Sequence, residues 1–145
     1  MKSEPNVYSI DHLQKDGTIW WEGIRNYQAR NFMRDDMKVG DAVLFYHSNA
    51  NPPGIAGLAT ICKEAYPDHF ALDKKSNYFC KKSSPEKNVW CMVDVKFVKK
   101  FKNLISLPTL KETKELEDMK VVQKGSRLSI QPVEKKHYDF ILKLA

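Results

Sequence analysis

The chain has 145 residues, of which 42% are hydrophobic, 11% aromatic and 29% charged. This length and composition fit one globular domain with a buried core and exclude a disordered chain. The formal net charge of +6 favours an anionic partner such as nucleic acid, but only weakly when taken alone.

Three cysteines, Cys62, Cys80 and Cys91, occur without CxxC spacing. Their odd number and wide separation favour free thiols in a reducing compartment. The four histidines are scattered, so we expect neither a metal nor a cofactor. No run approaches the roughly 18 apolar residues of a membrane span, and the N-terminus has no apolar signal core. We therefore expect a cytoplasmic protein, or a nuclear one in a eukaryote.

In the first half of the chain, short helices precede two strands. Ser9 is predicted to cap a short helix that ends at the turn 16–17, and Asn26 to cap a second helix. The apolar run 42–47 predicts a central strand, buried on both faces. A loop rich in Asn, Pro and Gly follows it, and residues 55–65 return as a second strand.

The second half begins with a long polar excursion at residues 67–85, which predicts a short strand at best. Residues 89–97 alternate with a period of two and predict a strand. A helix opens at 106–108, where proline is tolerated early. A short strand is predicted at 127–132, ended by proline, and a closing helix at 134–144.

These elements predict an α+β fold, in which a small, mostly antiparallel β-barrel is flanked by short helices. Neither an internal repeat nor a linker divides the sequence, so residues 1–145 are expected to form a single domain.

The densest group of chemically useful side chains lies at residues 20–31. It holds two tryptophans, a tyrosine, two arginines, two asparagines and a glutamine. Aromatic rings stack on bases, arginine binds phosphates or base edges, and asparagine reads Watson–Crick edges. The alternative is that Trp21 and Tyr27 simply plug one end of the barrel.

A second group, residues 45–49, ends the central strand. Tyr46 there could stack on a ligand and Ser48 could form hydrogen bonds. The alternative for His47 is that it caps the strand by bonding to backbone.

Little in the sequence indicates an enzyme. Ser48 and His47 are adjacent strand residues and point to opposite faces, so they do not form a triad. Neither a GxSxG motif nor a phosphate-binding glycine loop is present. Asp68 beside His69 is either an acid–base pair or part of an ordinary turn.

Several stretches resemble the hallmarks of the EVE-domain family, and they occur in family order over essentially the whole chain. They are Lys2-Ser3-Glu4-Pro5, Trp21-Glu22-Gly23-Ile24-Arg25-Asn26-Tyr27-Gln28-Ala29-Arg30-Asn31, Phe45-Tyr46-His47-Ser48, Gly54-Ile55-Ala56-Gly57, Ala65-Tyr66-Pro67-Asp68, Trp90 through Val95, and Arg127-Leu128-Ser129-Ile130-Gln131-Pro132.

The resemblance implies a PUA-like fold related to the YTH and ASCH domains, and a protein that reads a modified base in DNA or RNA. Carried over by motif, the base pocket draws on Ser3, Trp21, Asn26, Tyr46, His47 and Ser48. Nearby phosphate or base contacts are expected from Arg25, Arg30 and Arg127. Family members usually carry a few residues before this motif-bearing start. Either translation starts at Met1 or the true start lies upstream, and only in the first case is a shortened first strand expected.

Two other functions stay open at this point. One is a nucleic-acid-processing enzyme like some ASCH relatives, and the other is a small-ligand or protein-interaction module that uses the same pocket.

Overall fold

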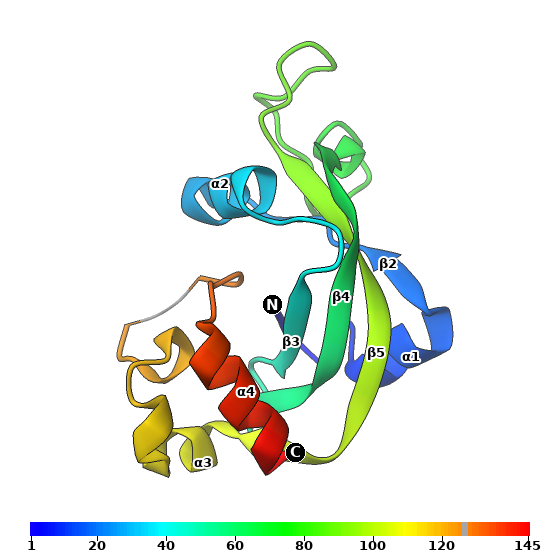
Figure 1. Ribbon diagram of the computed structural model, residues 1–145. Coiled ribbons are helices and arrows are strands. Elements are labelled where there is room, and N and C mark those ends of the chain that lie inside the picture. The colour runs from blue at the N-terminus through cyan, green and yellow to red at the C-terminus, as the bar shows by residue number, and fades with distance from the viewer. Residues whose placement is uncertain (126–127) are drawn as a thin grey trace. The chain divides into compact units, whose positions relative to one another are not determined.

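The computed structural model describes residues 1–125 and 128–145, and within them five strands, four α-helices and three short 3-10 helices (Figure 1). The strands are β1 (Lys2–Ser3), β2 (Thr18–Trp20), β3 (Ala42–His47), β4 (Gly54–Pro67) and β5 (Cys91–Ser106). The helices are α1 (Ile10–Asp16), α2 (Tyr27–Asp35), α3 (Leu107–Glu112) and α4 (Lys135–Leu144), with 3-10 turns η1 (His69–Ala71), η2 (Lys114–Leu116) and η3 (Lys120–Val122).

Side-chain caps fix where the first three α-helices begin. The Ser9 hydroxyl accepts from the backbone N–H of His12, whose ring accepts from the Ser9 N–H, which makes a capping box. Asn26 caps α2 and Ser106 caps α3 through a side-chain oxygen that accepts from the backbone N–H three residues further on, without the second bond of a capping box. Gly17, with φ of 79°, ends α1. The predicted starts of these helices are confirmed.

The sheet has the strand order β1-β3-β4-β5-β2, so β1 and β2 are its edges. The pairing of β1 with β3 is parallel, and that of β2 with β5 is antiparallel. The sheet is therefore mixed and is not closed into a barrel, so the α+β fold is confirmed and the predicted β-barrel describes the sheet only loosely. Closure needs edge strands that pair with each other along their length, but β1 has two residues and β2 has three.

Two strand predictions also change. β5 continues to Ser106 instead of ending at Phe97. The sequence did not predict this second half, because exposed lysines there hide the alternation of hydropathy. Residues 128–132 form no strand, although a strand was predicted over 127–132. The backbone carbonyl of Ser129 accepts from the N–H of Lys2 at 2.8 Å.

The chain divides into two compact units, which are called unit 1 and unit 2 here. Unit 1 comprises residues 1–17, 43–59 and 97–145. Within it, Gly57 of β4 lets α1 approach closely, since an added Cβ would stand 2.9 Å from Cγ1 of Ile10. An apolar cluster forms the core of this unit, from Leu44, Tyr46, Ile55, Leu58, Phe101, Ile105, Leu110, Leu116, Met119 and Ile141.

Unit 2 comprises residues 18–42 and 60–96. It contains β2, α2, η1, the second half of β4 and the first half of β5. The N–H of Trp21 donates to the carbonyl of Val93 at 2.8 Å, which extends the pairing of β2 with β5. Its buried apolar side chains include Trp21, Ile24, Ala29, Met33, Met37, Ile61, Ala71, Trp90, Met92, Val93 and Val95.

Of the helices described here, none is long and apolar enough to cross a membrane.

Candidate functional site

The residues predicted to form the site fall in both units. Unit 1 holds Ser3, Tyr46, His47 and Ser48, whereas unit 2 holds Trp21, Arg25, Asn26 and Arg30. Arg127 lies outside the described residues. Each set is therefore built up within its own unit.

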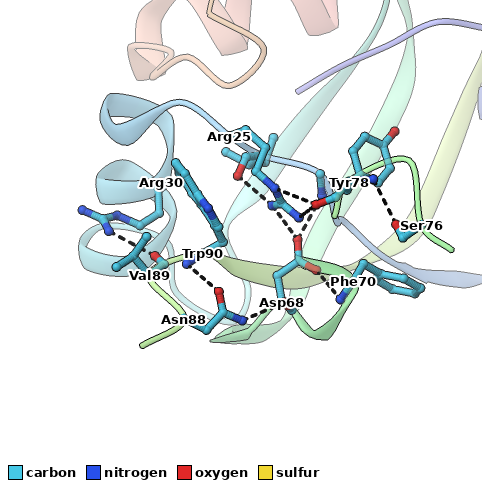
Figure 2. A network of polar contacts seen from close by, with 11 residues as sticks. Arg25, Arg30, Asp68, Phe70, Ser76, Tyr78, Asn88, Val89 and Trp90 are labelled. Atoms are coloured by element: carbon cyan, nitrogen blue, oxygen red, sulfur yellow. Dashed lines mark hydrogen bonds and ion pairs between the residues drawn. The ribbon is translucent and has the colours of Figure 1, made fainter. Parts of the chain in front are cut away.

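The centre of unit 2 is the carboxylate of Asp68, whose side chain is completely buried (Figure 2). Its Oδ2 accepts from the backbone N–H of Gly23 at 3.1 Å and from Nη1 of Arg25 at 2.9 Å. Its Oδ1 accepts from the N–H of Phe70 at 2.9 Å, which caps η1. A buried carboxylate needs such partners, because charge without compensation is very costly away from water.

The structure shows the turn that was one of the two interpretations of Asp68 and His69. The Asp68 carboxylate is bonded to three donors within unit 2, and His69 is exposed in the 3-10 turn that Asp68 caps. The predicted turn is confirmed.

Arg25 is held as firmly as the carboxylate that it neutralises. Besides the bond to Asp68, its guanidinium donates to the carbonyl of Ile24 at 3.0 Å, and to that of Tyr78 through Nε at 3.2 Å and Nη2 at 2.7 Å. Its Cζ lies 5.5 Å from the centre of the Trp90 ring. These bonds join three segments of unit 2, and the phosphate or base contact expected of Arg25 stays a prediction.

Glycine at position 23 makes room for this arrangement. Its φ of 84° lies in the left-handed region that favours glycine, and an added Cβ would stand 2.5 Å from Cε1 of Tyr78. Gly23 thus lets its backbone N–H reach Asp68 while the Tyr78 ring lies against it.

The other predicted residues of unit 2 also have structural partners. The Asn26 side-chain oxygen accepts from the N–H of Ala29 at 3.1 Å, so this oxygen caps α2. Trp21 is buried, with 9% of its surface exposed. Arg30 donates to the carbonyl of Val89 at 3.0 Å and to Oδ1 of Asn31 at 2.9 and 2.7 Å.

In unit 1, the pairing of β1 with β3 brings Ser3 and the end of β3 together. The N–H of Ser48 donates to the carbonyl of Ser3 at 2.9 Å, and the Ser3 hydroxyl donates to the carbonyl of Tyr8 at 2.6 Å. The Tyr46 ring is buried in the apolar cluster, and burial raises the pKa of its hydroxyl. Lys2 Nζ lies 5.8 Å from the centre of that ring.

His47 contacts backbone, as the alternative interpretation had it. Its Nε2 accepts from the N–H of Ile10 at 3.1 Å, so the imidazole is neutral and holds the start of α1. The Phe45 ring meets it edge to face at 5.8 Å. Burial lowers the pKa of His47, and nearby Asp11 and Lys100 act in opposite directions.

A small cavity of about 30 Å³ in unit 1 is bordered by Tyr46, Leu44, Ile55 and Met119 among others. Its size suits one or two water molecules rather than a base. Within the described ranges, we find no group of three His, Cys, Asp or Glu side chains that could hold a metal ion.

With this geometry in place, comparison with known proteins assigns the chain. The EVE domain matches residues 1–144. The chain belongs to the EVE domain family. Human thymocyte nuclear protein 1 is 43% identical over 99% of this chain and 72% of its own length. The EVE domain of this chain is thus a five-stranded mixed sheet with helices, and not a closed barrel.

Solved structures of similar proteins agree closely. The crystal structure of a protein from Pseudomonas syringae is 51% identical, covers 99% of this chain and 96% of its own, and has a TM-score of 0.96. The crystal structure of human THYN1 protein in complex with 5-methylcytosine-containing DNA is 43% identical, covers 99% and 94%, and has a TM-score of 0.91.

Sequence reasoning missed Tyr78, Asn88 and Trp90 as members of the network around Asp68. Asn88 donates to the carbonyl of Asp68 at 2.8 Å and accepts from the N–H of Trp90 at 3.1 Å. Residues 76–88 show no periodicity that would mark them as ordered. The available signal was that two of the family motifs carry opposite charges, with Arg25 inside residues 21–31 and Asp68 at the end of residues 65–68.

Proposed function

We propose that this EVE-domain protein binds DNA and recognises a modified base in it, with 5-methylcytosine the first base to test. The observation that carries the proposal is the structure of human THYN1 protein, a 43% identical member of the same family, in complex with DNA that contains 5-methylcytosine. The net charge of +6 fits a polyanionic partner.

The protein acts as a binding module rather than an enzyme in this proposal. The one acid–base pair that the sequence offered is Asp68 with His69, and the three donors on Asp68 give that carboxylate a structural role. We further propose that residues 1–145 act as one EVE domain, since β4 and β5 each run through both units.

The test is a fluorescence-anisotropy titration of matched oligonucleotides. Duplex DNA with one 5-methylcytosine, 5-hydroxymethylcytosine or N6-methyladenine is compared with plain duplex and with the corresponding RNA, at two salt concentrations. An added methyl group contributes at most roughly 10- to 200-fold in affinity, so the expected preference is modest. Equal affinity for plain and modified strands would contradict the recognition of a modified base, and only binding of nucleic acid to a basic surface would remain.

The residues proposed for base recognition are tested separately in each unit. In unit 2, Trp21→Phe keeps a buried ring but reduces its area, and we expect a lower preference for the modified base. Trp20→Phe is the matched control, since Trp20 is adjacent but 47% exposed. In unit 1, Ser48→Ala removes a hydroxyl and leaves the backbone bond to Ser3 in place. Unchanged preference in both Trp21→Phe and Ser48→Ala would contradict the proposed base contacts.

A further inference from the structure

Two arginines and three aromatic rings of unit 2 follow one another in a chain of contacts, called the aromatic ladder here. Arg30 Cζ lies 5.0 Å from the centre of the Tyr27 ring, and that ring lies 4.9 Å from the Trp90 ring at an angle of 31°. Arg25 Cζ lies 5.5 Å from the centre of the Trp90 ring and 5.9 Å from that of the Tyr78 ring. The order is Arg30, Tyr27, Trp90, Arg25, Tyr78.

The members of the aromatic ladder differ in exposure. Trp90 is buried, whereas 59% of Tyr27 and 38% of Tyr78 is open to solvent. Exposed tyrosines of this size usually lie singly on a surface, but these two belong to one chain of contacts with arginines between and beside the rings. The exposed rings are therefore the accessible part of an ordered structure.

Hydrogen bonds and one ion pair hold the two arginines in position. Arg25 donates to the carbonyl of Tyr78 and to the carboxylate of Asp68, and Arg30 donates to the carbonyl of Val89. A ring that is already fixed loses little conformational entropy when a planar ligand stacks on it. Unit 2 thus presents preorganised aromatic faces.

Positive charge accompanies these faces. Residues 73–89, called the lysine-rich segment here, include Tyr78 and carry five exposed lysines: Lys74, Lys75, Lys81, Lys82 and Lys87. Against them stand Asp73 and Glu86, so the segment has a net charge of +3, half of the +6 of the whole chain. Such charge attracts phosphates and makes binding depend on salt.

We propose that the aromatic ladder and the lysine-rich segment bind single-stranded nucleic acid, with unpaired bases stacking on Tyr27 and Tyr78 and phosphates meeting the lysines. Bases in a duplex stack on each other and offer no free face, whereas an unpaired strand offers one at every base. The proposal rests on the proposed function in one respect, that the partner is a nucleic acid. The proposal adds that this surface prefers single-stranded to double-stranded nucleic acid.

The experiment uses the full chain and a fluorescent oligothymidylate of about twelve nucleotides, within the usual range of single-strand sites. Its binding is compared with that of its duplex with oligodeoxyadenylate, at about 50 and 200 mM salt. The double variant Tyr27→Leu with Tyr78→Leu should bind the single strand roughly 5- to 100-fold more weakly. Tyr27→Phe with Tyr78→Phe should retain binding, because the stacking face remains.

Two further variants separate stacking from other effects. Trp20→Leu removes an aromatic side chain of unit 2 that is 47% exposed but packs on Phe70, outside the aromatic ladder, and should leave affinity unchanged. Lys81→Gln with Lys82→Gln should reduce the salt slope by roughly 1.4, because each phosphate that a lysine neutralises on a single strand contributes about 0.7 to that slope.

The proposal is overturned if the double leucine variant binds the single strand as the wild type does, or if Trp20→Leu costs as much. It is also overturned if polyglutamate of equal charge binds as tightly as the oligonucleotide, which would mark the surface as a site for acidic proteins. The preference for a modified duplex is measured on the same proteins. If the protein prefers the modified duplex but does not bind the single strand, only this inference fails. If it binds neither the modified duplex nor the single strand, the proposed function fails too.

Discussion

Unit 1 is built around an apolar cluster, and its polar side chains bond mainly to backbone, whereas unit 2 has a completely buried carboxylate at its centre. In unit 2, the ion pair of Arg25 with Asp68 holds the segment that carries Tyr78 against Gly23. The surface segments of unit 2 are therefore held in place by a buried ion pair, whereas those of unit 1 are held by apolar packing.

The largest expected effect comes from removing one partner of the buried ion pair. Arg25→Ala leaves the Asp68 carboxylate buried without its cation, which costs about 3–5 kcal/mol. Chemical denaturation measures the loss of stability, and hydrogen exchange should show the amides of unit 2 exchanging fastest. The control is Arg34→Ala, which removes the exposed pair with Asp35 and should leave the denaturation midpoint unchanged. Equal effects of the two variants would show that burial does not give the pair of Arg25 with Asp68 more weight than an exposed pair of the same unit.

A cavity in the apolar cluster tests unit 1 in the same assay. Leu110 is completely buried there, and Leu110→Ala should cost about 2–5 kcal/mol through reduced apolar burial and the cavity left behind. This destabilisation should be insensitive to salt, since no charge is involved. If salt changed the destabilisation by Leu110→Ala as much as it changes the destabilisation by Arg25→Ala, apolar packing would not be what distinguishes unit 1.

The stability of the protein should fall on mild acidification because of His47. Burial lowers the pKa of His47 in the folded state, so below the ordinary value of about 6.5 the unfolded chain binds a proton that the folded chain does not. The contribution of His47 to stability is thus full above about pH 6.5 and is lost as pH falls below it, with the bond to Ile10 at stake, about 1 kcal/mol. The buried Met1 amino group, whose pKa burial lowers to about 5, adds a loss of the same sign that begins below about pH 8 and that His47→Gln leaves in place.

His47→Gln offers an acceptor that does not titrate and should flatten this dependence in denaturation measured between about pH 5 and 7. His69→Gln is the control at an exposed histidine. A profile that stays as steep in His47→Gln as in the wild type would show that another group is responsible.

The smallest perturbation is chemical labelling of Cys80, which lies in the lysine-rich segment. Hydrogen bonding from the Ser83 side chain lowers the pKa of its thiol to about 7, whereas burial raises the pKa of Cys62 and of Cys91. Iodoacetamide should therefore modify Cys80 first, at a rate that rises as pH passes about 7, as followed by mass spectrometry of the peptides. Single-stranded DNA should slow the reaction, and faster labelling of Cys62 would contradict the predicted order.

Local signals in the sequence predicted the helices well. Ser9, Asn26 and Ser106 mark the starts of three helices because a cap depends on residues within one turn. The alternation at the start of β5 predicted a strand, but its end was missed because exposed lysines interrupt the pattern. The predicted β-barrel matches the open sheet only loosely, because closure depends on which strand edges meet and no local pattern encodes this.

The sequence by itself determined the family, the basic charge and the starts of three helices, since these depend on residue identity and short-range spacing. Only the tertiary structure decided that Asp68 and Arg25 form a buried pair, because they are 43 positions apart and their partner Tyr78 lies 53 positions beyond Arg25. Burial gives such a pair its energetic weight, and burial arises only when distant segments fold together. The same long-range contacts turn separate aromatic and basic residues into one chain of contacts.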